Sequence, residues 1–416
     1  MTAQPGTLTT REALATPGVA PLLIANTVLY TGVLLQATAL GKNVFDITKS
    51  ELDIGWLGLA EFVPAALLVL VTGTVADRFP RRRVSMLAQA GELLCALLLA
   101  WYALTEPTST VPIFGVVVLF GVFRAFLAPA MRPIAAMIAP EGGLPKVIAL
   151  YGATWTGAAI IGPALSGFAY AIHPAVAYFT AAGLIASAIG VMSKVQVPMV
   201  RSTGTQRPTL RDALQGLVFI RRTPVLLAAI SLDLFAVLAG GAVALLPVIA
   251  EEQLQVGDVA YGWLRAAGGI GAAGTAIILS VRPIRSRVGK TLIVVVGIFG
   301  ASTVVLGVTT SYWVAFLAMI VINGSDMVSV FIRGSLTPLV TPDDKRGRVS
   351  AVESVFIGAS NELGAFESGA VSSLVGAQAT IVGGGVATIA VAGAWWGAFP
   401  SLRKVNTFAE LEQVHD

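Results

Sequence analysis

The chain alternates between long apolar segments and short polar connections along almost its whole length. Most segments reach the roughly 20 residues that an α-helix needs to cross the hydrocarbon core of a bilayer. Short turns such as Thr105-Glu106-Pro107 separate neighbouring segments, so we expect most of them to pair as antiparallel hairpins. The pattern predicts an all-α polytopic membrane protein with twelve transmembrane helices, at residues 18–43, 54–76, 83–104, 111–138, 145–172, 175–196, 223–250, 259–281, 290–310, 312–335, 347–374 and 378–399.

The longest polar stretch, residues 197–222, divides the twelve helices into two bundles of six. Its second part places Leu210, Leu214, Leu217 and Val218 on one face of a helix, which predicts an amphipathic helix after a flexible linker. A disordered linker throughout is the alternative. The predicted domains are an N-terminal tail (1–17), a first six-helix bundle (18–196), the linker with its amphipathic helix (197–222), a second six-helix bundle (223–399) and a C-terminal tail (400–416).

The two halves also resemble each other. Gly55-Trp56-Leu57 opens the second segment and Gly262-Trp263-Leu264 opens the eighth, and a basic connection follows each of these segments. This indicates a parallel duplication, an organisation that in transporters places the substrate site near the membrane midplane between the repeats.

Basic residues gather in alternate connections. The connections that follow even-numbered helices are rich in lysine and arginine, whereas the opposite ones hold only Lys42 and Lys49. Because basic loops remain in the cytoplasm, both termini are predicted to be cytoplasmic. The expected location is the bacterial cytoplasmic (inner) membrane.

Composition excludes several function classes. Only 12% of the residues are charged, against about 25% in soluble domains. The net charge of +4 is spread over loops, which argues against a nucleic-acid partner. One cysteine, two histidines and no phosphate-binding Gly-rich loop leave no basis for a metal site, an enzyme or an ATP-driven pump. The expected partners are a small-molecule substrate and the lipid bilayer, with the proton gradient as energy source, no cofactor and a monomeric protein.

Ten ionisable residues within the apolar segments are considered as functional candidates. Each costs at least ~2.5–3.5 kcal/mol at the bilayer centre, so such residues are functional candidates by default. We predict Glu61, Asp233 and Glu362, in that order, as proton-coupling acids, with Asp326 next and Glu92 ranked lower. For each acid, a permanent ion pair with an arginine is the alternative. Arg124 and Arg265 are the expected charge partners in a central cavity. Glu353 is expected to form a structural ion pair with Arg333 or with the first basic loop. Glu367 is the tenth candidate residue.

The first basic loop joins the second and third segments. Within it, Gly73, Ala76, Asp77, Arg78, Arg81 and Arg82 resemble the signature loop between helices two and three of the major facilitator superfamily, and Pro80 departs from the usual glycine. The resemblance implies a conformational role for Gly73, Asp77, Arg78 and Arg81, to which Arg333 and Glu353 are added as gating residues. An ordinary basic cytoplasmic loop is the alternative.

The fifth segment carries spaced glycines and a proline: Gly157, Gly162, Pro163 and Gly167. This run resembles the glycine-proline signature of the exporter branch of the superfamily, although Ala158 and Ser166 stand where that signature has glycines. The resemblance implies export, and a kinked helix without bearing on direction is the alternative. Arg124 matches the arginine of the family's helix-four signature, but Leu127 and Ala128 replace the residues that usually follow.

The second half shows a further resemblance. Asp326-Met-Val-Ser and Arg346-Gly-Arg348-Val-Ser, with Ala244-Leu-Leu-Pro247 and Gly262-Trp-Leu-Arg265, are similar to bacterial siderophore exporters of the enterobactin type and macrolide-efflux relatives. This implies a secondary active transporter that exports an amphipathic small molecule, such as a drug or siderophore, by proton antiport and alternating access. A proton-coupled importer or lipid-type flippase on the same fold is the alternative, and a non-transporting receptor is a second.

Asp77→Asn is predicted to lower transport while leaving folding and substrate affinity nearly unchanged. Asp77 stands at the end of a helix, away from the predicted midplane site, so its charge is expected to act on the conformational change and not on cargo. Flux in proteoliposomes and binding to the purified protein check this. Normal flux, or loss of binding by a folded variant, contradicts it.

Overall fold

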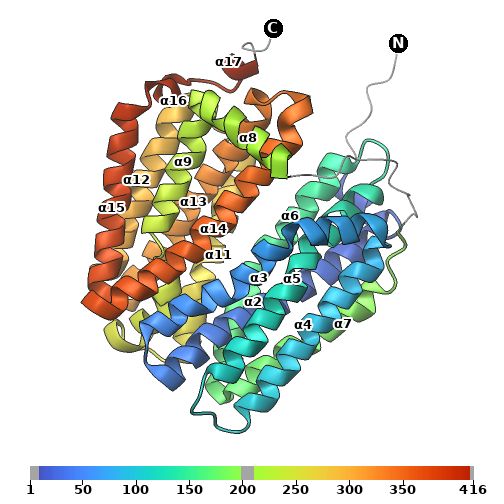
Figure 1. The fold of residues 1–416 in the computed structure, drawn as a ribbon, viewed down its shortest axis with the longest axis vertical. Helices are drawn as coiled ribbons and strands as arrows, with labels where there is room; N and C mark the ends of the chain where they lie inside the picture. The colour runs from blue at the N-terminus through green and yellow to red at the C-terminus, as the bar shows by residue number, and fades with distance from the viewer. Residues whose placement is uncertain (1–8, 198–209, 413–416) are drawn as a thin grey trace. The chain divides into compact units, whose positions relative to one another are not determined.

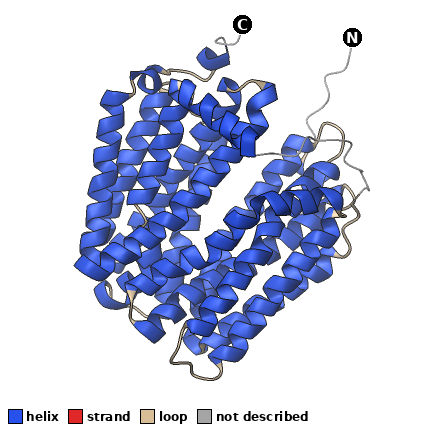
Figure 2. Ribbon diagram, viewed as in Figure 1, coloured by secondary structure: helices blue, strands red, loops and turns tan. Residues whose placement is uncertain are grey.

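The computed structural model describes residues 9–197 and 210–412, in which every regular element is a helix (Figure 2). The chain forms two compact units, labelled by helix in Figure 1. The first comprises Met1–Thr48 and Ala60–Arg207, and the second comprises Lys49–Leu59 and Pro208–Asp416. The third helix is therefore continuous across the boundary, since its first residues belong to the second unit.

The first unit is a bundle in which α2 packs along α6 and α7, and α4 packs along α5 and α7. Its core is aliphatic, with Leu29, Met131, Ile134 and Ile185 fully buried. α7 begins at a proline, whose missing N–H and fixed φ suit the first turn of a helix. The helices are α1 (Thr10–Ala15), α2 (Val19–Thr48), α3 (Glu51–Arg78), α4 (Arg81–Ala103), α5 (Val111–Met137), α6 (Leu144–Ile172) and α7 (Pro174–Met192).

The second unit contains the remaining helices. Leu226, Leu292, Ile332 and Leu336 are among the buried residues of its core. Its long helices are α9 (Pro224–Ala239), α11 (Asp258–Val281), α12 (Val288–Val308), α13 (Tyr312–Val340), α14 (Asp343–Val375) and α15 (Ala377–Ala398). Shorter elements are α8 (Leu210–Arg222), η1 (Ala242–Leu245), α10 (Leu246–Val248), η2 (Ile249–Gln253), α16 (Pro400–Lys404) and α17 (Ala409–Glu412).

Both units use the same packing scheme. In the first unit α2 packs against α6 and α7, and in the second α9 packs against α14 and α15. Likewise α4 packs against α5 and α7, whereas α12 packs against α13 and α15. If only the twelve membrane-spanning helices are counted, each pair in the second unit lies six helices after the corresponding pair in the first. This is the arrangement that a duplicated six-helix ancestor produces.

The seventh predicted segment, 223–250, is not one α-helix. α9 ends at Ala239, and the chain continues through Gly240 and Gly241 into η1, α10 and the π-helical turn η2. Glycine is a poor helix former and proline at 247 removes a backbone donor, which accounts for the break. Gly241 also permits close approach to α14, because a Cβ on it would collide with the carbonyl oxygen of Gly364.

Ten helical spans in the described residues are long and apolar enough to cross a membrane. α3 and α14 are the two remaining long helices. α14 contains Glu353, Glu362 and Glu367 together with small residues, a composition that suits a helix packed inside a membrane protein better than one facing lipid. With these two helices, the architecture is the predicted twelve-helix, two-bundle membrane fold.

The predicted tails are partly structured. Thr9 and Glu12 form a capping box at the start of α1, and the hydrogen bonds from Thr9 lower the pKa of Glu12. At the other end, the backbone N–H groups of Val288 and Gly289 donate to Asn406 and Val405, 3.1 Å each. The residues after α15 therefore satisfy free donors at the start of α12. Residues 1–8, 198–209 and 413–416, which include part of the predicted linker, lie outside the described residues.

Candidate functional site

A buried charge cluster occupies the interior of the second unit, with charged residues from α9, α13 and α14. Arg333 on α13, with 5% of its side chain exposed, pairs with Asp233 on α9 at 2.8 Å between Nη2 and Oδ1. Its Nη1 lies 3.8 Å from Oε1 of Glu353 on α14. The arginine also donates from Nε to the hydroxyl of Ser329 at 3.4 Å. Glu353 thus has the partner proposed from its sequence position.

Asp326 belongs to the same cluster. It lies two turns before Arg333 on α13, and the charges of Asp233 and Arg333 both act on it. A small cavity lies beside it, lined by Asp233, Ser325, Asp326 and Ser329 and by apolar side chains that include Phe299. Two carboxyl groups therefore lie against the Arg333 guanidinium, and a third, that of Asp326, lines a small cavity together with Asp233.

A second charge pair lies in the first unit. Arg124 on α5 forms an ion pair with Glu61 on α3, and its guanidinium lies 5.9 Å from the centre of the Phe120 ring. α3 and α5 approach closely here because Gly121 has no side chain and lies against the backbone of Glu61. Glu61 and Arg124, both predicted from sequence, are thus direct partners.

Two further predicted charges, Glu362 and Arg265, lie in the second unit. Glu362 on α14 faces Gly58, since a Cβ on that glycine would come 2.6 Å from its Oε2. Arg265 on α11 is half-buried, and no ion pair with a described residue is recorded for it. The predicted role of Arg265 as a cavity charge partner therefore stays a prediction, as does the coupling role of Glu362.

The glycines of the fifth predicted helix differ in their surroundings. A Cβ on Gly162 would come 2.8 Å from the carbonyl oxygen of Thr31 and 3.0 Å from Cβ of Leu34, both on α2. Among described atoms, nothing lies within 4 Å of the same position on Gly157. Pro163 lies inside α6, which continues to Ile172, and Gly167 is buried. Gly162 is therefore a point of close approach between α6 and α2.

The first basic loop lies between α3, which ends at Arg78, and α4, which begins at Arg81. No described atom lies within 4 Å of a Cβ built on Gly73, so the close helix approach expected there is not made within the described atoms. Arg82 donates to the carbonyl oxygens of Ser193 at 3.3 Å and Val195 at 2.9 Å. This ties the start of α4 to the end of α7. The side chain of Asp77 lies outside the described part of the chain.

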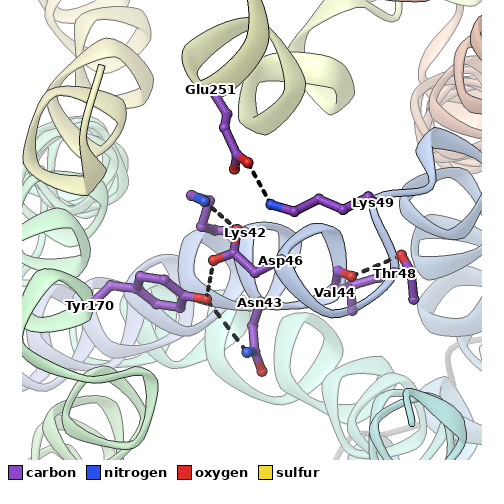
Figure 3. A network of polar contacts seen from close by, with 8 residues as sticks. All are labelled: Lys42, Asn43, Val44, Asp46, Thr48, Lys49, Tyr170 and Glu251. Carbon is purple, nitrogen blue, oxygen red and sulfur yellow. Dashed lines mark hydrogen bonds and ion pairs between the residues drawn. The ribbon is translucent and has the colours of Figure 1, made fainter. Parts of the chain in front are cut away.

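One polar network was missed by sequence reasoning (Figure 3). Lys42, expected in a loop, lies inside α2 because that helix continues to Thr48; it is only 8% exposed and pairs with Asp46. Asp46 also accepts a hydrogen bond from the Tyr170 hydroxyl at 2.7 Å. The hydroxyl of fully buried Tyr178 donates to Asn43 at 3.1 Å. The i, i+4 spacing of Lys42 and Asp46 was the available signal.

Tyr178→Phe is predicted to destabilise the protein by about 1–3 kcal/mol, because it leaves the buried Oδ1 of Asn43 without its donor. Thermal unfolding of the purified protein measures this. Tyr102→Phe is a suitable control, because the Tyr102 hydroxyl bonds to Ser109 at an exposed position. Equal unfolding temperatures for the two variants contradict the prediction.

Each of the two charge clusters sets a carboxyl group beside an arginine. A buried carboxyl group holds its proton more firmly when its arginine moves away and releases it when the arginine returns. In the part of the chain that the structure describes, no group of three or more His, Cys, Asp or Glu side chains is arranged to hold a metal ion. The arrangement is suited to coupling a change of conformation to proton binding.

Comparison with known proteins identifies relatives of this chain. The sequence model of the Major Facilitator Superfamily matches residues 22–360. The uncharacterized MFS-type transporter YfiS of Bacillus subtilis (strain 168) is 26% identical over 306 residues, which are 70% of this chain and 69% of that protein.

Solved structures share the fold at low identity. A bacterial homologue of the human lysosomal transporter Spinster, in an inward-facing and unoccupied conformation, has a TM-score of 0.70 and 14% identity, covering 96% of this chain and 98% of that one. A mutant of the peptide transporter POT has a TM-score of 0.75 and 10% identity, covering 96% and 99%. The chain therefore belongs to the major facilitator superfamily of membrane transporters.

Proposed function

We propose that this transporter exports an amphipathic small molecule, drug-like or siderophore-like, in exchange for protons across the bacterial cytoplasmic membrane. The observation that carries the proton coupling is the cluster of Asp233, Asp326 and Glu353 around Arg333. Three ionised carboxylates against one arginine leave two uncompensated negative charges in a membrane interior. Binding protons to the cluster is the simplest way to avoid that cost.

The cluster also connects helices that must shift if the second unit changes conformation. Asp233, Arg333 and Glu353 come from α9, α13 and α14, so relative movement of these helices changes which carboxyl the arginine holds. A carboxyl that loses the arginine takes up a proton, and one that gains it gives up a proton. Alternating access and proton transfer are coupled through the same side chain.

Export and the cargo class rest on the sequence resemblances. The Gly157-to-Gly167 run is similar to the exporter signature, and the stretch from Asp326 to Val349 is similar to siderophore and macrolide exporters. The cavity beside Asp326 is small, so it suits a proton or water and not the cargo. The cargo site is proposed near the membrane midplane, as the duplicated architecture implies.

Flux in proteoliposomes with an imposed pH gradient tests the proposal. Everted proteoliposomes are prepared with an interior more acidic than the external medium. A panel of drugs and metal-free siderophores is then added to the external medium. The expected result is accumulation of at least one compound that collapses when a protonophore removes the gradient. Accumulation only with the reverse gradient indicates an importer, and lipid movement without cargo flux indicates a flippase. Binding without any flux indicates a receptor.

A further inference from the structure

Glu92 lies on α4 in the interior of the first unit, and it belongs to neither of the ion pairs described above. Its side chain has 0% exposure. Neither carboxyl oxygen has a hydrogen-bond partner among the described residues. Burying an ionised carboxylate without a partner is far more costly than burying the neutral acid. The position is therefore suited to a carboxyl group that carries a proton.

The charges around Glu92 come from three helices. Arg124 on α5 and Glu61 on α3 are the charged groups that act on it, and Tyr30 on α2 and Cys95 on α4 are the other titratable groups that interact with it. α7, which also packs on α4, contains no acidic or basic residue. Arg124 is thus the cation shared by two acids, of which it pairs with Glu61.

α5 packs directly against α4 next to Glu92. The ring of Phe123, the residue before Arg124, packs on Gly91, the residue before Glu92. A side chain at Gly91 would collide with that ring. The close packing places the helix that carries the arginine beside the helix that carries the acid, so a change of side-chain partner does not require the helices to separate.

A second buried group independently indicates a proton on Glu92. Gln89 precedes Glu92 by three residues and lies on the same face of α4. Its Nε2 donates to the sulfur of Met131 at 3.8 Å, whereas its Oε1 is buried without a donor among the described residues. An ionised carboxylate only accepts hydrogen bonds, but a protonated one also donates. A proton on Glu92 supplies a donor one helical turn from this acceptor.

We propose that Glu92 is a proton-binding site of the first unit, which holds its proton while Arg124 is paired with Glu61 and gives it up when Arg124 pairs with Glu92 instead. In the exchange, the O–H bond of Glu92 breaks and its proton passes to the carboxylate of Glu61, which has lost the guanidinium. One carboxylate balances one guanidinium before and after. The inference deepens the proposed proton-coupled transport, but its test does not depend on transport.

Infrared difference spectroscopy of the full-length protein in lipid tests the protonation directly. The wild-type minus Glu92→Gln spectrum at neutral pH is expected to contain a carbonyl stretch of a protonated carboxylic acid. The wild-type minus Glu61→Gln spectrum is the matched comparison. A carboxylate band in place of the acid band in the Glu92 comparison, or no band from either form, overturns the inference.

The exchange of partners is tested in the Glu61→Gln background. There Arg124 has lost the carboxylate of Glu61, so Glu92 is expected to ionise. The Glu61→Gln minus Glu61→Gln/Glu92→Gln spectrum should therefore contain a carboxylate band and no acid band. An acid band in this comparison contradicts the exchange. If both spectra behave as expected but no cargo is moved by a pH gradient, the proposed transport fails while the proton site stands.

Folding of the variants does not limit the test. Glutamine has nearly the shape of glutamic acid, and Glu92→Leu provides a second variant in which the unpaired polar group is removed altogether. Because removing an unsatisfied buried polar group is neutral or stabilising, Glu92→Leu is expected to unfold at the wild-type temperature or above. A large loss of stability in Glu92→Leu indicates that Glu92 is ionised and paired, and overturns the inference.

Discussion

Replacing Gly162 with leucine is expected to disrupt the packing of α6 on α2 and to reduce both the yield of folded protein and the flux. A Cβ at this position already comes 2.8 Å from the carbonyl oxygen of Thr31, and the remaining atoms of leucine have no space between the two backbones. Over-packing costs about 1–3 kcal/mol in a well-packed core, and occasionally more. We expect the upper part of that range, because the colliding atom belongs to the backbone.

Gly190→Leu is the matched control. Gly190 lies on an exposed part of α7, and among described atoms nothing lies within 4 Å of its Cβ position. Thermal unfolding and size-exclusion profiles compare the two variants. Paired cysteine labelling from both sides of the membrane, on a Cys95→Ala background, reports the balance of conformations. If Gly162→Leu retains wild-type stability, flux and labelling, the α2–α6 contact is not important and the export proposal loses a main support.

Most of the helix pattern was predictable, because a run of apolar residues long enough to span a bilayer has few alternatives to a helix. The helix predictions are wrong where local chemistry overrides this general tendency of apolar runs to form helices. The helix ending at Ala239 was predicted to continue to residue 250, because apolar residues follow Gly240 and Gly241 and conceal a break caused by backbone preferences. Lys42 was assigned to a loop because a lysine commonly marks a helix end, although a carboxylate one turn later allows it inside α2.

The candidate site was predictable as a list of residues but not as pairs. Charged residues in apolar segments are conspicuous, so Glu61, Arg124, Asp233 and Arg333 were all identified from sequence. Which acid faces which arginine depends on helix rotation and packing, and Arg333 pairs with Asp233, about 100 residues away in sequence. Glu92 was ranked low because sequence does not reveal that a side chain is both fully buried and without a partner.

Asp233→Asn is expected to abolish accumulation of cargo against a gradient while leaving exchange of cargo across the membrane in place. The change removes the carboxylate 2.8 Å from Arg333, but Glu353 remains 3.8 Å from the arginine. The buried cation therefore does not lose all compensation, and the fold is expected to survive. What is lost is one of the groups that can bind and release a proton as the arginine changes partner.

Two measurements separate coupling from a purely structural role. Uphill accumulation under an imposed pH gradient should fall by more than about tenfold, roughly the effect of 1.4 kcal/mol, whereas counterflow with equal pH on both sides should remain close to wild type. Glu367→Gln, which neutralises an exposed carboxyl on α14, is the control and should pump normally. If Asp233→Asn loses counterflow together with accumulation, Asp233 is a structural partner of Arg333. If single neutral variants of Glu61, Asp233, Glu362 and Asp326 all pump uphill, none of these four acids alone carries the coupling, and the cluster around Arg333 serves stability and not transport.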